Sequence, residues 1–439
     1  MLGLALALAF GAAASASAQS LQELYDLARA YDATYLAARA LADTAQYRLG
    51  QAEALSRPNV GLGLGGNASR NDLPGASPTI NTNTLTAGIT GSYALYNRAN
   101  SVTIEQARRG VEVSVADLQL AEQDLIVRVV QAYFDVLAAQ DTLSTATAAK
   151  GAIAEQLASA KRNFEVGTAT ITDTREAQAR YDISTAQEIA ADSDLRVRRV
   201  QLDQLVGRVG VQPKPLAVPV VFPPLVSNDV NNWVSQGEQG HPQIRKAQLA
   251  LDVARLETEK ARAAGGVTVD LNGSVGAQNL HNNLNGAAAV SSGVGTTKTA
   301  SLGFQINYPL YTGGLVQNRI KETLVLEEKS RNDLDFARRA VEAGTRAYFL
   351  SVLSTEAQVK AQEAAESSSK LALDATQLGY KVGVRVNLDV LNAQTQLYTT
   401  QRDLYRARYD VVLNRLRLLQ ASGQLSPEDI AKANRLLAP

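Results

Sequence analysis

The chain has 439 residues, and its 43 Lys and Arg balance its 43 Asp and Glu, so the formal net charge is zero. That balance offers no basic field for binding nucleic acid. Cys is absent, which excludes disulfides, Cys-ligated zinc, a thiol nucleophile and a lipidated N-terminal Cys. Apolar residues make up 45% of the chain, with one Met and one Trp. This composition is typical of long helices or coiled coils rather than of a large aromatic core.

Residues 1–18 have the pattern of a secretory signal peptide. An apolar run from Leu2 to Phe10 is followed by small residues and by an A-x-A site that ends at Ala18. The positive start of such a peptide is missing, because no Lys or Arg precedes Arg29. The alternative is an apolar beginning of the first helix. No later stretch approaches the ~20 apolar residues of a membrane-spanning helix, so we expect an exported protein without one.

The next region changes its periodicity. Residues 20–56 carry apolar side chains at helical spacing without Pro, which predicts one helix. Then Val60, Leu62 and Leu64 alternate with small or polar residues, and the alternation returns after a loop rich in Asn, Pro and Gly. This pattern predicts strands at about 59–70 and 84–96, joined by an exposed loop.

The second half of the chain repeats the strand pattern and predicts strands at about 267–278 and 298–311. Each of the four strands has one apolar face and one face of Gly, Ser, Thr, Asn and Gln. A soluble sandwich would give the same pattern, but the strands have the ~9–11 residues that cross a bilayer when tilted. Four strands cannot close a barrel, and membrane strands tolerate no open edge. We therefore expect three copies to supply twelve strands.

Long helical regions follow both strand pairs, since no Pro occurs from Asn97 to Val209 or from Leu310 to Ser426. In the first of them, apolar residues step alternately by four and three, as in a coiled coil. Two such seams run side by side, one through Val129 and one through Val130. Two seams require two neighbours, which favours a closed cylinder of helices.

The two halves match at a constant offset, which indicates a duplication. The residues that recur 215 positions later are Tyr93, Ala132 and Phe134, as Tyr308, Ala347 and Phe349. The sequence thus predicts a first repeat at 19–210 and a second at 228–423. Five Pro residues make segment 211–227 an extended linker outside the helices. Residues 424–439 form a C-terminal tail.

One short motif occurs in each half, as FEVGTATITDTREA from Phe164 and as YKVGVRVNLDVLNA from Tyr380. In each copy a Gly permits the positive φ that ends a helix. The residues concerned are Gly167 and Gly383, and the candidates for capping the following helix are Thr172, Asp173 and Asn387. Each copy is therefore predicted to be a helix-to-helix turn, at the same end of two homologous hairpins.

No catalytic or metal site is predicted. His241 precedes Pro242 at a helix start, His281 lies in a predicted loop, and neither has a carboxylate at ligand spacing. The LGLGGN stretch near Leu62 lacks the Lys-Ser/Thr of a phosphate-binding loop. We expect neither an enzyme nor a cofactor.

These motifs, with INYPLYTGG at the end of the fourth strand and HPQIRKAQLALDVA at the start of the second repeat, resemble the TolC-type outer-membrane efflux protein family. The resemblance covers essentially the whole mature chain. It implies a mainly helical homotrimer, in which a twelve-stranded membrane β-barrel is continued by a twelve-helix periplasmic α-barrel. The Pro-rich linker would belong to an equatorial band.

The resemblance also implies a function and partners. The chain would be the outer-membrane exit duct of a tripartite efflux pump or type I secretion system, a passive conduit gated at its periplasmic end. Its partners would be two sister copies, outer-membrane lipid, a periplasmic adaptor and an inner-membrane transporter of RND, ABC or MFS type. A different reading is a periplasmic coiled-coil structural protein without a pore, which would give no stepwise conductance in planar bilayers. An outer-membrane barrel enzyme is a third reading, but the chain lacks any Ser, His and acid cluster.

By resemblance, the gate lies at the tip formed by the two turns. Tyr380 and Arg385 would hold the helices shut through contacts to Thr172 and Asp173 of a neighbouring coil. Charge-assisted hydrogen bonds of ~1.5–3 kcal/mol each would bias such a gate without locking it. The alternatives to a gating role are that Asp173 caps a helix and that Arg385 is a charged side chain exposed to solvent.

The resemblance also implies a ring of carboxylates on the pore axis, one Asp389 from each copy. The best-known family member has a second Asp one helical turn further on, where this chain has Asn392. We therefore expect a weaker acidic ring and weaker block by cations.

Overall fold

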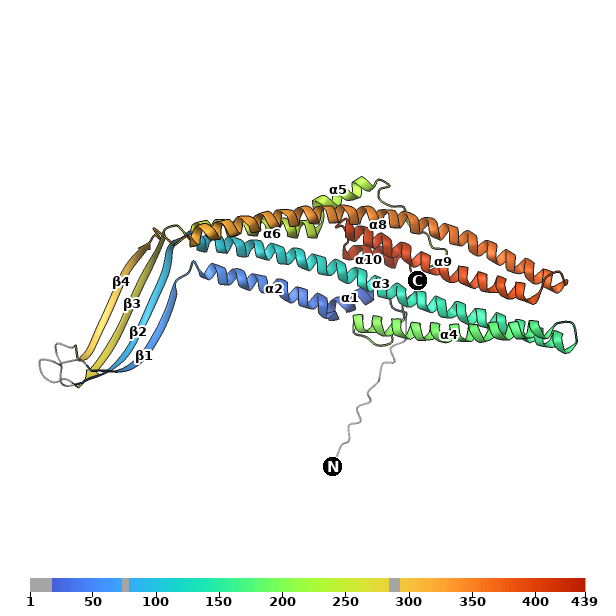
Figure 1. Cartoon of the computed structure of the whole chain (residues 1–439), viewed down its shortest axis with the longest axis horizontal. Coiled ribbons are helices and arrows are strands. Elements are labelled where there is room, and N and C mark those ends of the chain that lie inside the picture. Colours follow the sequence, from blue (N-terminus) through green and yellow to red (C-terminus); the bar gives the residue numbers. More distant parts are fainter. Residues whose placement is uncertain (1–17, 73–78, 284–292, 439) are drawn as a thin grey trace, which may run out of the picture. The chain divides into compact units, whose positions relative to one another are not determined.

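The computed structural model describes residues 18–72, 79–283 and 293–438. The predicted signal peptide at 1–18 lies outside the described residues except for Ala18. Within the described part the chain is mainly helical with four strands (Figure 1). The elements are α1 Leu21–Tyr31, α2 Ala33–Ala54, β1 Asn59–Asn71, β2 Ile80–Asn97, α3 Arg98–Glu165, α4 Ile171–Val206, α5 Val230–Gly240, α6 Pro242–Ala263, β3 Thr268–Asn282, β4 Gly295–Asn307, α8 Leu315–Lys381, α9 Asn387–Ala421 and α10 Pro427–Asn434.

The chain divides into two compact units. Among the described residues, the helical unit consists of 18–39, 117–244 and 337–438, and the sheet unit consists of 40–72, 79–116, 245–283 and 293–336. The long helices α3 and α8 each contribute to both units. None of the described helices is long and apolar enough to cross a membrane.

The sheet is antiparallel throughout, in the order β1-β2-β3-β4, so β2 and β3 join the two halves of the chain (Figure 1). The register places Leu62, Ile89, Val275 and Ala300 in one row across the four strands. Successive side chains of a strand point to opposite faces. One face of the sheet is therefore apolar along most of its length, and the other carries Thr, Ser, Asn and Gly.

The strand ends differ from the prediction. The fourth strand begins at Gly295 and ends at Asn307, not at residue 311. Pro309 has no N–H to donate to a ladder, which explains the earlier end. The second strand begins at Ile80, four residues before the predicted start, and the third runs on to Asn282. The residues at these turn-side ends are mostly polar, so the alternation of apolar and polar residues does not extend to them.

The prediction of one helix over residues 20–56 is wrong, because the helix is broken at Asp32. This residue has φ −59° and ψ 115°, outside the helical region. Its Oδ1 accepts the Tyr35 N–H at 2.8 Å, and both carboxylate oxygens accept from Arg128 at 2.9 Å. The second half has the same break at His241, whose Nδ1 accepts the Gln243 N–H at 3.0 Å. A side-chain acceptor thus starts a new helix in each half.

The core of the helical unit joins α1, α3, α4, α9 and α10. Leu125, Val129 and Val136 of the predicted first seam are fully buried in it. The Pro-rich segment and the C-terminal tail are tied together, since Ala217 N–H donates to Leu436 O at 2.9 Å and Ala438 N–H donates to Pro215 O at 2.8 Å. The linker therefore has ordered backbone partners although it forms no helix.

Candidate functional site

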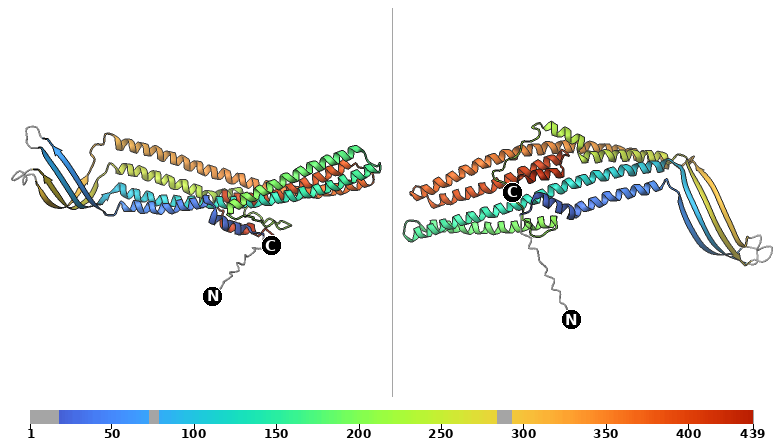
Figure 2. Two further views of the ribbon diagram at one scale, coloured as in Figure 1. Left: turned by 90° about the horizontal axis from the view of Figure 1, so that it is seen from below. Right: turned by 180° about the vertical axis from the view of Figure 1, so that it is seen from behind.

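The two predicted turns have the same backbone hydrogen bonds. Thr168 N–H donates to Asn163 O at 2.8 Å, and 216 residues later Val384 N–H donates to Gly379 O at 2.9 Å. A bond across six residues of this kind closes the C-terminus of a helix in the Schellman motif. Helices α3 and α8 therefore end in the same way, and both turns lie at one end of the helical unit (Figures 1 and 2).

A glycine at the centre of each turn makes this geometry possible. Gly167 has φ 80° and Gly383 has φ 81°, in the left-handed region that side chains disfavour. A Cβ added at either position would meet nothing within 4 Å. The requirement for Gly is therefore one of backbone conformation alone.

Helix α4 begins with a complete capping box, and the cap is Thr170 rather than Thr172 or Asp173. Thr170 Oγ1 accepts the Asp173 N–H at 3.2 Å, and Asp173 Oδ2 accepts the Thr170 N–H at 2.9 Å. The carboxylate also accepts from the Thr170 hydroxyl at 2.8 Å. Two backbone donors at the helix start are thus satisfied. Asp173 supports the cap from the third helical position, and Thr172 remains exposed.

Helix α9 begins with a weaker cap. Val386 occupies the cap position and has no side-chain acceptor, so Asn387 is the first helical residue and not the cap. Val386 N–H donates to Asp389 Oδ2 at 3.4 Å, and Arg385 Nη1 lies 3.7 Å from the same oxygen. The Arg385 side chain is 61% exposed. Because exposed pairs contribute little, this ion pair leaves Arg385 available to other partners.

Three polar links join the first hairpin to the second near the tip. Asn163 Nδ2 donates to Tyr380 Oη at 3.2 Å, and Arg180 Nη2 donates to Asn392 Oδ1 at 2.9 Å. The Gln156 side-chain amide donates to Asn387 Oδ1. An apolar cluster made of α3, α4 and α9 residues lies beside them, namely Ile153, Leu157, Ala160, Ala177 and Leu391. The two hairpins are therefore held together inside one chain by neutral or singly charged bonds.

The structure places the predicted site residues at this tip but pairs them differently within one chain. Tyr380 contacts Asn163, and Arg385 contacts Asp389. The expected contacts to Thr172 and Asp173 would have to form between copies of the chain. Sequence reasoning did not single out Gln156, Asn163 and Arg180. Their positions in the sequence do not predict these contacts, because the packing of the two hairpins determines which side chains meet.

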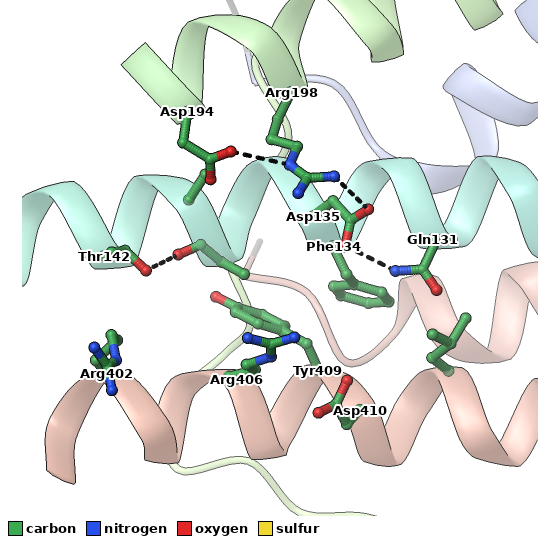
Figure 3. Close-up of a pocket in the computed structure, with 13 residues that line it drawn as sticks. Gln131, Phe134, Asp135, Thr142, Asp194, Arg198, Arg402, Arg406, Tyr409 and Asp410 are labelled. Carbon is green, nitrogen blue, oxygen red and sulfur yellow. Dashed lines mark hydrogen bonds and ion pairs between the residues drawn. The ribbon is translucent and has the colours of Figure 1, made fainter. Parts of the chain in front are cut away.

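A polar cavity of about 170 Å³ lies further along the same unit, between α3, α4 and α9 (Figure 3). Its charged lining residues are Asp135, Asp194, Arg198, Arg402, Arg406 and Asp410. Arg198 lies between two carboxylates, 3.6 Å from Asp135 and 3.4 Å from Asp194 (Figure 3). Three cations thus face three carboxylates, and the local charge is balanced.

Half-buried carboxyls mark this layer of the helical unit. The Tyr409 hydroxyl, which lines the cavity, donates to Asp141 Oδ2, and burial raises the pKa of Asp141. Burial also raises the pKa of Asp410, against the opposing charges of Arg406 and Arg417. The described residues contain no group of three or more His, Cys, Asp or Glu that could hold a metal ion. The layer has the chemistry of a packed polar contact between helices.

Comparison with known proteins shows what this chain is similar to. The family model described as outer membrane efflux protein matches residues 24–208 and 233–424. Outer membrane protein TolC of Vibrio cholerae is 32% identical over 417 residues, covering 95% of this chain and 93% of that protein. Alkaline protease secretion protein AprF of Pseudomonas aeruginosa is 32% identical over 70% of this chain and 63% of its own length. The CmeC outer membrane channel of Campylobacter jejuni has the same fold, with a TM-score of 0.78 at 16% identity over 95% of this chain and 90% of that one.

Proposed function

The chain belongs to the outer membrane efflux protein family, and we propose that three copies of it build one continuous duct. It is an outer-membrane exit duct for efflux or type I secretion. Its two repeats would be residues 19–210 and 228–423, with 211–227 as an equatorial segment, 424–439 as the tail and 1–18 as a cleaved signal peptide.

The observation that carries the proposal is the open four-stranded sheet. Strands β1 and β4 are both edges, and each has a neighbour on one side only. An edge in lipid leaves N–H and C=O groups without partners, which costs several kcal/mol per group. Pairing β4 of one copy with β1 of the next removes every edge when three copies close a twelve-stranded barrel. The long helices of the three copies would continue it as a twelve-helix barrel.

The polar face of the sheet would line the path. Along it the described strands carry Gly, Ser, Thr, Asn and Gln, and the one charged residue is Asp270. A wall of short polar side chains offers no binding pocket, so selection would rest on width and on the charge at the tip. Such a duct carries out no reaction and needs no cofactor.

The periplasmic tip would be the gate. Arg385 and Thr172 are exposed in the single chain, so both are available to a neighbouring copy. We expect Tyr380 and Arg385 to meet Thr172 and Asp173 across that boundary when the tip is closed. Asp389 would supply one carboxylate per copy to a ring on the axis.

Energy and substrate choice would come from other proteins. A passive conduit needs a periplasmic adaptor and an inner-membrane transporter of RND, ABC or MFS type. The name of AprF refers to secretion of a protease, which supports a type I secretion role beside efflux for the present chain.

Single-channel recording in planar bilayers tests the proposal. We expect stepwise conductance from the purified protein and a several-fold larger resting conductance from Arg385→Ala, because one closing contact per copy is lost. Arg175→Ala is the matched control, since this exposed Arg on α4 lies next to the first turn and is given no closing role. Asp173→Ala is a poorer choice because it also removes a helix cap. Absence of any stepwise current would favour a coiled-coil structural protein without a pore.

A further inference from the structure

The apolar face of the sheet has two chemically different ends. Both strand pairs start and finish at the helices, so the turns between β1 and β2 and between β3 and β4 lie at the opposite end. At the helix end the face carries the aromatic residues Tyr93, Tyr96 and Phe304. At the turn end the first polar residue after the apolar rows is Lys298 of β4, which pairs with Ala277. We define this turn end of the apolar face as the basic rim.

The register locates the basic rim relative to the apolar rows. The row of Leu64, Ala87, Ala277 and Lys298 follows directly on the row of Leu62, Ile89, Val275 and Ala300. His281 and Arg70 lie on the same face, two and three rows further toward the turns. The rim therefore places a basic side chain on three of the four strands, and Lys298 is the nearest to the apolar band.

The distance along β4 matches the thickness of a membrane. Ten residues separate Tyr308, just after the strand, from Lys298. At ~3.3 Å per residue and a tilt of ~40°, they span about 25 Å along the membrane normal, which is the height of the apolar band of outer-membrane barrels. A barrel that places Tyr308 at the inner interface thus places the ammonium group of Lys298 at the opposite interface, where lipid phosphates lie.

Charge on this face favours an anionic partner. Among the residues that the structure describes in β1 to β4, this face carries no Asp or Glu. Arg70 has one acidic neighbour beyond the strand, Asp72, at 3.5 Å. Lys298 is exposed and has four apolar or small residues of the previous two rows beside it. A ligand bound there would meet a cation and an apolar wall together.

We propose that Lys298 binds the phosphate group of an anionic lipid in the outer leaflet, with the acyl chains on the adjoining apolar rows. The assignment rests on the proposed barrel, which sets the turn end of the strands on the outer side. An ammonium group donates charge-assisted hydrogen bonds to phosphate oxygens. The apolar wall distinguishes a lipid from free phosphate, because only a lipid fills both parts of the site.

Lipid binding to the purified full chain tests this site. The probes are phosphatidic acid and phosphatidylcholine with the same acyl chains, titrated into the protein in a neutral detergent and counted by native mass spectrometry. We expect phosphatidic acid to bind more tightly, and Lys298→Gln to weaken its binding about fivefold, the contribution of one basic residue near anionic lipid. Lys298→Arg should keep the preference.

Two controls separate the site from general effects. Thr299→Ala changes the next residue of β4 on the opposite face, and Lys360→Ala removes the same charge from an exposed position on α8. Both should bind phosphatidic acid as the parent does. An equal loss in Lys360→Ala, or no loss in Lys298→Gln, would overturn the proposal. Displacement of phosphatidic acid by millimolar inorganic phosphate would also overturn it, since it would show a site for free anions.

The outcome for the duct can be told apart from the outcome for the lipid. Lys298→Gln should retain the stepwise conductance of the parent in planar bilayers, because its side chain faces away from the polar wall. Normal conductance without any preference for phosphatidic acid would overturn the lipid site and leave the duct intact. A parent protein without stepwise conductance would overturn both.

Discussion

The two helix-to-helix turns share a backbone but differ in how their side chains close them. In the first turn Thr170 and Asp173 satisfy each other in a full capping box, with bonds of 2.8 to 3.2 Å. In the second turn Val386 offers no side-chain acceptor, the Asp389 N–H donates to Val386 O at 3.1 Å, and Asp389 Oδ2 accepts the Val386 N–H at 3.4 Å. A duplicated backbone has thus been kept while the local capping has not. The difference indicates that the first turn is built for stability and that the second has charges left for contacts with other partners.

The two turns also differ in the contacts that their side chains make with the other hairpin. Phe164 of the first turn is 43% exposed, whereas its counterpart Tyr380 receives a hydrogen bond from Asn163. Glu176 of α4 corresponds to Asn392 of α9, 216 residues later, and Asn392 accepts from Arg180. Residues of the first hairpin thus donate hydrogen bonds to side chains at and after the second turn, and the first turn has no such contact in the pairs described above.

The shared backbone predicts equal costs for removing either glycine. Gly167→Ala and Gly383→Ala should each lower the free energy of unfolding by roughly 1–2 kcal/mol, the cost of a left-handed conformation for a residue with a Cβ. Thermal or denaturant unfolding measures both. Gly151→Ala, in the middle of α3 with free space around an added Cβ, is the control and should instead stabilise by up to ~1 kcal/mol. A negligible cost at one turn alone would mean that the two backbones are not equivalent.

The difference in capping predicts opposite effects of exchanging the cap residues. Thr170→Val should destabilise the first turn by ~1 kcal/mol, because the Asp173 N–H loses its acceptor. Val386→Thr should stabilise the second turn by a smaller amount, since a hydroxyl then becomes available to the Asp389 N–H. Hydrogen exchange of amides at the start of α4 and α9 reports each effect locally. Thr170→Ser, which keeps the hydroxyl, should be close to the parent. Unchanged exchange at α4 in Thr170→Val, or at α9 in Val386→Thr, would contradict the difference in capping.

The smallest expected effect concerns the position where the turns differ in charge. Asn392→Asp should strengthen block of the channel by divalent cations, by only about twofold because Arg180 would pair with the new carboxylate. The same change in an Arg180→Gln background should block more strongly. Current at fixed voltage with and without the cation measures both. Identical block in all variants would place residue 392 away from the conducting path.

Periodicity was a guide to the type of each element but not to where it breaks or ends. The alternation around Leu62 and Val275 predicted the strands because a sheet with one apolar face imprints a period of two on the sequence. The end of β4 was predicted too late because Ile306, Tyr308 and Leu310 continue the alternation past Pro309. Local patterns carry the type of element more reliably than its boundary.

The breaks and contacts that the sequence did not reveal depend on partners distant in the chain. Asp32 looked like one polar residue in a continuous helix, and its role follows from Arg128, 96 residues later. The tip glycines were recognisable because a positive φ imposes its own residue type. By contrast, the link between Arg180 and Asn392 depends on the packing of two hairpins, which no local pattern specifies.

Asp32 and Asp141 give the helical unit opposite responses to acid. Burial raises the pKa of Asp141, so the folded chain takes up this proton more readily than the unfolded chain, and the fold gains stability as the pH falls toward the ordinary range of Asp. Arg128 lowers the pKa of Asp32, so its contribution to stability is complete above that range and is lost as the pH falls below it. On mild acidification the first response precedes the second. The layer around Asp141 therefore does not lose stability through this carboxyl when the surrounding medium becomes mildly acidic.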